Sequence, residues 1–165
     1  MNKSANNAGH GDTGRSMDQM DQRLVSSGST LAPGCASADV LVVEPLSFWG
    51  GYDAALGKII EKSHPSYGKS LAGKIMVMSR AKGSSSSSSV LAEAIRNGTG
   101  PSGIVLRERD LIISIGVIVA NELYGIRVPL VVVDDSVFHA LCRSAHPIHI
   151  DASSEDTPAR IEVAS

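Results

Sequence analysis

The chain has 165 residues, a formal net charge of −2 and 42% hydrophobic residues, which predicts one globular domain, or one domain with a tail. The near-neutral charge excludes an extended basic surface for nucleic acid or an anionic membrane, and no apolar run reaches the ~18–20 residues of a membrane span. With only 2 cysteines, Cys35 and Cys142, the chain alone is too poor in thiols for a disulfide framework, a Cys-rich zinc site or an iron–sulfur site. We expect no metal ligands in it. The start of the sequence has no apolar leader segment, so we expect a cytoplasmic protein.

The two ends of the chain differ in composition from the middle. Residues 1–33 are rich in Asn, Gly, Ser, Asp and Gln, and such a segment buries too little apolar area to offset its ordering entropy. We therefore expect 1–33 to be a disordered or loosely attached tail and 34–150 to be the folded domain. Residues 151–165 are expected to form a polar C-terminal tail.

The first half of the expected domain is a series of strands and turns. Apolar and β-branched runs predict strands at 39–44, 57–61 and 74–78. A proline and a glycine pair mark residues 45–51, between the first two strands, as a loop.

The second half contains helices. The pattern predicts a helix at 90–96, a strand at 103–107, a helix from the N-cap Asp110 through Tyr124 with Gly125 at its end, and a strand at 129–133. Continuously apolar strands on both sides of a helix of this length indicate a buried parallel pair with a right-handed crossover. Short edge strands are expected at 149–150 and 161–163. The predicted fold class is α/β, with a barrel-like, partly parallel sheet and flanking helices.

Gly83 opens a run of six serines, Ser84 to Ser89, between the expected strand at 74–78 and the helix at 90–96. A serine run is commonly a flexible linker, but a linker would separate complete domains, and neither side is complete here. As a strand-to-helix corner, the run would let Gly83 approach other backbone closely and supply the helix N-cap. The first amides of the helix, unpaired and partly positive, would then form a site for a carboxylate or phosphate. The alternative is a capped turn without a ligand.

Six motifs follow one another along the chain. They are LSFWGG (46–51), GKII (57–60), HP (64–65), GxxLAG (68–73), GSSSSSSVL (83–91) and ANELYGIxVP (120–129). Together this ordered series resembles the swivel domain of the aconitase X family, from about residue 40 to residue 133.

The resemblance implies an enzyme subunit. Members of the family are hydro-lyases in which a large subunit or domain carries an iron–sulfur cluster on cysteines, and a small swivel domain closes over the active site. This chain would then be the small subunit, active only in a heterodimer or higher assembly with a large aconitase X-type subunit that holds the iron–sulfur cluster. The implied substrate is a small hydroxy acid, foremost cis-3-hydroxy-L-proline, which is dehydrated to Δ1-pyrroline-2-carboxylate. Mevalonate 5-phosphate is the alternative substrate.

The resemblance also assigns a catalytic residue. In the wider aconitase superfamily the swivel domain carries a Gly-Ser-Ser-Arg-Glu-His motif whose first serine acts as the base. By position that serine is Ser84, which would abstract a C–H proton from the substrate. Ser86 stands where the arginine would be, so the group that would bind the substrate carboxylate is absent from the motif. Lys82, Arg80 or a residue of the partner are the candidates to replace it.

Five further residues are expected to bind substrate. Gly83, Ser85 and Ser86 would shape the anion pocket through backbone amides or hydroxyl groups. Gly50 and Gly51 would let the backbone approach the ligand, with a tight turn as the alternative.

A reading from another class is a non-catalytic module that binds an anion or a partner through the same corner. An enzyme subunit should expose an apolar patch where its partner docks. The single tryptophan, Trp49, is expected to pack in the core or at that interface. A stable monomer without a partner would favour the module.

Overall fold

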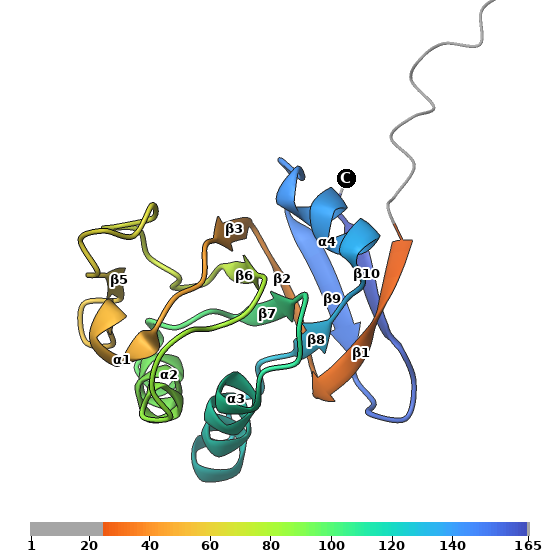
Figure 1. The fold of residues 1–165 in the computed structure, drawn as a ribbon. Coiled ribbons are helices and arrows are strands. Elements are labelled where there is room, and N and C mark those ends of the chain that lie inside the picture. Colours follow the sequence, from red (N-terminus) through yellow and green to blue (C-terminus); the bar gives the residue numbers. More distant parts are fainter. Residues whose placement is uncertain (1–24, 165) are drawn as a thin grey trace, which may run out of the picture.

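The computed structural model describes residues 25–164, and Figure 1 shows their fold. The strands are β1 (Val25–Ala32), β2 (Gly34–Ala38), β3 (Val40–Val43), β4 (Tyr52–Asp53), β5 (Lys58–Ile59), β6 (Ile75–Met78), β7 (Gly103–Leu106), β8 (Leu130–Val132), β9 (Ile148–Ala152) and β10 (Ala159–Val163). The helices are α1 (Phe48–Gly51), α2 (Ser87–Arg96), α3 (Leu111–Tyr124) and α4 (Asp135–Cys142). Within these residues no helix combines the length and the apolar character needed to span a bilayer.

Most of the strands form one 8-stranded sheet in the order β2-β9-β10-β1-β8-β7-β6-β3. Neighbours from β2 to β8 in this order are antiparallel, whereas β8, β7, β6 and β3 pair parallel. The two ends of the sheet, β2 and β3, are consecutive in the chain and separated only by Asp39. The sheet therefore curls back toward itself as a nearly closed barrel.

The inner parallel strands β6 and β7 are buried on both faces, and their side chains alternate between two cores. In β6, Met76 and Met78 belong to the core beneath α2 and α3, whereas Ile75 and Val77 belong to the other core. The second core is closed by side chains of α4, β9 and β10, namely Phe138, Leu141, Ile148, Ile150 and Ile161. Figure 1 shows α2 and α3 on one side of the parallel strands and α4 beside the antiparallel ones.

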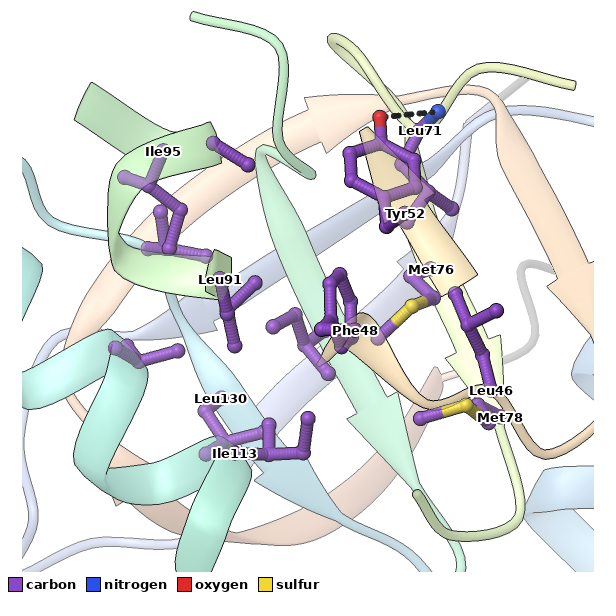
Figure 2. Close-up of a cluster of buried hydrophobic side chains, with 14 of the residues drawn as sticks. Leu46, Phe48, Tyr52, Leu71, Met76, Met78, Leu91, Ile95, Ile113 and Leu130 are labelled. Atoms are coloured by element: carbon purple, nitrogen blue, oxygen red, sulfur yellow. Dashed lines mark hydrogen bonds between the residues drawn. The ribbon is translucent and has the colours of Figure 1, made fainter. Parts of the chain in front are cut away.

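Phe48 occupies the centre of the first core and is fully buried. Figure 2 shows its ring between Leu91 of α2 and Met76 of β6. The Tyr52 ring meets it edge-on at 5.6 Å between centroids, and the Tyr52 hydroxyl accepts from the Leu71 amide at 3.2 Å. These contacts fix both ends of the segment around α1, which forms one wall of the candidate site.

Helix α3 begins and ends where the capping residues predict. The Asp110 carboxylate accepts from the Ile113 amide at 2.9 Å, and Gly125 ends the helix with a left-handed φ of 66°. Within the helix, Gly116 allows close packing on α2, because a Cβ there would come 2.9 Å from the Ser88 carbonyl oxygen. The predicted strands of the parallel half of the sheet, β3, β6, β7 and β8, are likewise confirmed.

The sheet extends past the expected domain at both ends. β1 lies between β10 and β8, so residues 25–32 belong to the sheet and not to a tail. β10 lies between β9 and β1, so the segment 151–165 contains an interior strand. β9 and β10 are thus not the short edge strands that the sequence predicted. The remaining residues of the expected tail, 1–24, lie outside the described residues.

Two local predictions also need correction. The strand expected at 57–61 is only the two-residue β5, which pairs with β4 outside the main sheet. Helix α2 starts at Ser87, three residues before the expected start, so half of the serine run is helical. Helix α4 was not predicted.

Candidate functional site

The candidate site lies at the carboxyl edge of the parallel strands, where α/β sheets commonly bind ligands. β3 and β6 are adjacent and parallel. The segment 44–51 follows β3, and the segment 79–86 follows β6. Because both strands end at the same edge, these two segments meet there, and the amino end of α2 lies beside them.

Three contacts fix the loop that leads from β6 to α2. The Lys82 amide donates to the Leu46 carbonyl at 3.2 Å, and the Ala81 amide donates to the Asp110 carboxylate at 3.3 Å. Gly83, with φ +99°, lies directly against Ser47, since a Cβ on Gly83 would come 2.7 Å from the Ser47 Cβ. Only glycine fits this conformation and this separation without a shift of one loop.

Together with Glu61, the two segments line a hollow of ≈ 320 Å³. It is lined by Ser47, Trp49, Gly50, Gly51, Glu61, Lys82 and Gly83. Three of the predicted binding residues, Gly50, Gly51 and Gly83, are therefore brought together. Gly50 has φ +74° and open space where a Cβ would be, while a Cβ on Gly51 would meet Leu46 at 3.3 Å. The pair forms a tight turn, as the alternative expected, and it also lines the hollow. Its contact with a substrate stays a prediction.

Trp49 is 60% exposed, so it does not pack in the core. Its ψ of 115° is non-helical, and with Gly50 it interrupts α1. The indole is thus presented at the rim of the hollow rather than held beneath it.

The serine corner (residues 83–89) is built differently from a simple capped helix. The N-cap residue, Ser86, makes no side-chain cap bond, contrary to expectation. Instead the Ser84 hydroxyl oxygen accepts from the Ser86 amide at 3.2 Å. The amide of Ser87 donates to the Ser84 carbonyl at 3.0 Å and that of Ser88 to the Ser85 carbonyl at 3.2 Å. The first turn of α2 is therefore closed internally, in 3₁₀ fashion.

The unpaired amides precede the helix, whereas they were expected to be the first amides within it. Among residues 25–164, the amides of Gly83, Ser84 and Ser85 have no hydrogen-bond partner in this fold. Ser84, Ser85 and Ser86 are exposed and do not line the hollow, but they continue directly from its wall at Gly83. Three consecutive free donors at a helix amino end suit an anion.

Lys82 is the basic side chain of the hollow. Its ammonium donates to a Glu61 carboxylate oxygen at 2.8 Å. This hydrogen bond is the main reason why the pKa of Glu61 lies below its usual range. Arg80, the other candidate for the missing arginine, is paired with Glu108 at 3.8 Å and does not line the hollow.

Sequence reasoning missed three residues of this region: Ser47, Glu61 and Ser87. Ser47 and Glu61 line the hollow, and Ser87 is the buried serine of the run. No local pattern marks them, because their roles depend on contacts between segments far apart in the chain. His64 is not part of the site. It is buried, accepts from the Ser66 amide at 3.0 Å and bonds the Glu44 carbonyl at 3.0 Å, so it is a structural residue.

The residues of this chain do not fit an iron–sulfur cluster. Within 25–164 no three His, Cys, Asp or Glu side chains are placed to hold a metal ion. Cys35 lies on β2 and donates to Asp151 at 3.4 Å, while Cys142 ends α4. The pKa of the Cys35 thiol is raised, mainly by desolvation and to a lesser extent by its hydrogen bond to Asp151. The pair therefore offers neither the number of ligands nor ready thiolates.

Comparison with known sequences identifies relatives. The model of the family described as "Aconitase X swivel domain" matches residues 25–157. The chain is 42% identical over 102 residues to a cis-3-hydroxy-L-proline dehydratase of Pseudomonas aeruginosa, which covers 61% of this chain and 18% of that protein. It is 35% identical over 103 residues to a phosphomevalonate dehydratase small subunit of Methanothermobacter thermautotrophicus. This alignment covers 62% of this chain and 75% of that subunit. The chain thus spans less than a fifth of the first relative and most of the second.

Two solved structures share the fold. Aconitase X of Thermococcus kodakaraensis in its holo-form superposes with a TM-score of 0.71 and 29% identity, covering 86% of this chain and 98% of that chain. A UPF0107 protein solved by NMR gives a TM-score of 0.70 and 27% identity, covering 86% and 100%. The predicted α/β class, with a curled and partly parallel sheet, is confirmed.

Proposed function

The chain belongs to the aconitase X swivel-domain family, and from this premise we propose that it is the small subunit of a hydro-lyase that dehydrates a small hydroxy acid. The large partner subunit would hold the iron–sulfur cluster, since the described residues of this chain do not fit one. The contribution of this chain is then the catalytic base and part of the substrate pocket. We further propose a cytoplasmic enzyme, in keeping with two free thiols.

The placement of the Ser84 hydroxyl carries the proposal. A serine is a poor base unless its alkoxide is stabilised. Here the hydroxyl oxygen accepts from the Ser86 amide at 3.2 Å and lies at the positive end of the ten-residue helix α2. Both effects favour a negative oxygen at this atom. Ser84 is also exposed, so a substrate carried by a partner could reach it.

The substrate's anionic group would be bound beside this base. The free amides of Gly83, Ser84 and Ser85 offer three donors to a carboxylate. Lys82 supplies the positive charge that the missing arginine would otherwise provide, and Glu61 keeps its ammonium in the wall of the hollow. Gly50 and Gly51 let the substrate approach the backbone on the opposite side.

The favoured substrate is cis-3-hydroxy-L-proline, because the P. aeruginosa relative with that name is 42% identical to this chain. In this reaction Ser84 accepts the proton from C2 and hydroxide leaves C3, which produces an enamine. Protonation of the enamine at C3 and loss of the proton on nitrogen give Δ1-pyrroline-2-carboxylate, with the net loss of one water. Mevalonate 5-phosphate is the second candidate, because the chain covers 75% of a small subunit named for that substrate.

Exposed apolar side chains support the need for a partner. The outer face of α3 presents Leu111, Ile115, Ile118 and Leu123, which are 75%, 42%, 45% and 69% exposed. A surface helix normally turns polar residues to water. The face starts beside Asp110, whose carboxylate accepts from the Ala81 amide in the loop between β6 and α2, so a protein covering the face would lie next to that loop.

The experiment is anaerobic affinity purification of the tagged full chain from its own cells, with identification of the co-purifying protein and an iron assay. A larger iron-bearing partner, and turnover of cis-3-hydroxy-L-proline by the complex, would support the proposal. Turnover of mevalonate 5-phosphate alone would move the assignment to the second candidate. An iron-free monomer without a partner would contradict the enzyme and favour the non-catalytic module.

A further inference from the structure

We propose that Ser87 is a positioning residue that fixes the Ser47–Gly51 segment against the amino end of α2, and thereby sets the width of the substrate hollow. The inference rests on the proposed function for its catalytic consequence. The structural part, a clamp between two loops, stands on contacts within this chain.

Ser87 differs from the rest of the serine run in burial. It is 1% exposed, whereas Ser84, Ser85, Ser86 and Ser89 are exposed. A buried hydroxyl needs hydrogen-bond partners. Its oxygen accepts from the Trp49 amide at 3.0 Å and lies 3.5 Å from the Ser47 hydroxyl.

Ser47 completes the clamp from the other side. Its hydroxyl donates to the Trp49 carbonyl at 2.9 Å. Both backbone polar groups of Trp49 are therefore bound by serine hydroxyls, at a residue whose ψ of 115° interrupts α1. The next residue, Gly50, has a left-handed φ of 74°. This irregular turn forms a wall of the hollow, so its shape depends on the two serines.

The clamp is coupled to the base because Ser84 and Ser87 are joined by the 3₁₀-type turn that leads into α2. The Ser87 amide donates to the Ser84 carbonyl at 3.0 Å. A shift of the Trp49 turn relative to Ser87 is therefore also a shift relative to Ser84. Helix propensity gives no reason for serine here, because alanine is the better helix former. The hydroxyl acceptor supplies the reason.

The test compares Ser87→Ala with the matched variant Ser89→Ala in the full-length chain. Ser89 is in the same helix but exposed, and its side chain accepts no hydrogen bond from another segment within residues 25–164. Amide hydrogen exchange of Trp49, read by NMR, reports the clamp directly, and the fluorescence of this only tryptophan reports the turn. We expect exchange at Trp49 to accelerate by about tenfold or more in Ser87→Ala, because the amide loses its acceptor. Exchange in Ser89→Ala should match the wild type.

In the assembled enzyme, Ser87→Ala should raise KM by about tenfold with a smaller fall in kcat and an unchanged pH profile, since Ser84 is intact. Unchanged Trp49 exchange would overturn the clamp. Unchanged KM with faster exchange would overturn its role in substrate positioning. If no variant, nor the wild type, dehydrates a substrate, the proposed function fails while the exchange result still decides the clamp.

A second variant guards against loss of folding. Ser47→Ala removes the bond to the Trp49 carbonyl but leaves the Ser87 acceptor in place. Trp49 exchange should then accelerate less than in a folded Ser87→Ala protein, by a few-fold. Two results would contradict the assignment of the clamp to Ser87. The first is a Trp49 exchange rate in Ser47→Ala as high as in Ser87→Ala. The second, if only Ser47→Ala folds, is an acceleration of Trp49 exchange by tenfold or more.

Discussion

The Lys82 ammonium and a Glu61 carboxylate oxygen lie 2.8 Å apart and join the loop between β6 and α2 to the segment after β5. The pair is partly exposed, with side-chain exposures of 48% and 26%, so solvent screens it and its effect on stability is small. Its role is to hold one positive charge in the wall of the hollow.

Glu61→Gln tests the pH dependence of this pair. The hydrogen bond from Lys82 lowers the pKa of Glu61 below 4.5 in the folded chain. The folded protein therefore holds the Glu61 proton less tightly than the unfolded chain does. The stabilisation is fully present above the unfolded pKa and is lost as the pH falls through the folded pKa. Urea unfolding at several pH values should show Glu61→Gln less stable than wild type at pH 6–7, with the difference vanishing in acid. The control is Asp39→Asn. It breaks a different ion pair, between Asp39 and Lys74, whose charged atoms lie 3.2 Å apart and which does not line the hollow. It should leave KM unchanged, whereas Lys82→Met should raise it.

Ser84→Ala should abolish turnover and leave assembly intact. Loss of a positioned base lowers rates by about 10²–10⁴, and the exposed side chain contributes little to packing. The measurement is kcat of the reconstituted complex, with size-exclusion chromatography to verify assembly. The Ser89→Ala enzyme serves as comparison and should retain its rate. Near-full activity of Ser84→Ala would remove this serine from the role of base.

The parts of the fold that local signals specify could be predicted. Helix α3 carries its own N-cap and a left-handed glycine at its end, and both boundaries agree with the structure. β6 and β7 are apolar on both faces because α2 and α3 cover one side, and α4 together with β9 and β10 covers the other. In each case a few neighbouring residues contain the information.

β1 could not be predicted, because its sequence is VSSGSTLA. It is a strand through pairing with β10 and β8, whose paired residues are 98 or more positions away in the chain. Gly28 within it allows that approach, since a Cβ would come 2.9 Å from the Val132 carbonyl oxygen.

The candidate site likewise combines residues that local sequence patterns mark with residues that they do not. The serine corner is visible in the sequence, whereas Glu61 and Ser87 acquire their positions only from tertiary contacts.

Charged substitutions on the outer face of α3 should weaken assembly. Ile115 and Ile118 are 42% and 45% exposed on this face, so Glu at both positions is tolerated by the isolated chain. Burying these carboxylates against an apolar partner is costly. We expect recovery of the partner with tagged Ile115→Glu/Ile118→Glu to fall at least about tenfold, which corresponds to about 1.4 kcal/mol, with an unchanged circular dichroism spectrum. Leu56→Glu, at a loop residue that is 69% exposed, is the matched control. Equal recovery of the partner with both proteins would place the docking surface elsewhere.

Gly83→Ala tests how closely the two loops of the site approach. The substitution destabilises in two ways. It places an alanine at a φ of +99°, and it introduces a Cβ only 2.7 Å from the Ser47 Cβ. The backbone conformation costs about 1–3 kcal/mol, and the contact adds about 1–3 kcal/mol of overpacking. A loss near 4 kcal/mol would lower Tm by roughly 8–16 °C in a chain of this size.

The glycine at the end of α2 separates these two costs. Gly98 has φ +73° and nothing within 4 Å of the position that a Cβ would take, so Gly98→Ala measures the conformational cost alone, about 1–2 kcal/mol. Adding Ser47→Gly to Gly83→Ala removes the Cβ and hydroxyl that the new methyl meets. The double variant should therefore regain the part of the Tm decrease that is caused by overpacking. If Gly83→Ala is no more destabilising than Gly98→Ala, the loops have room to separate. The hollow would then be wider than the structure gives it, and the clamp on Trp49 weaker.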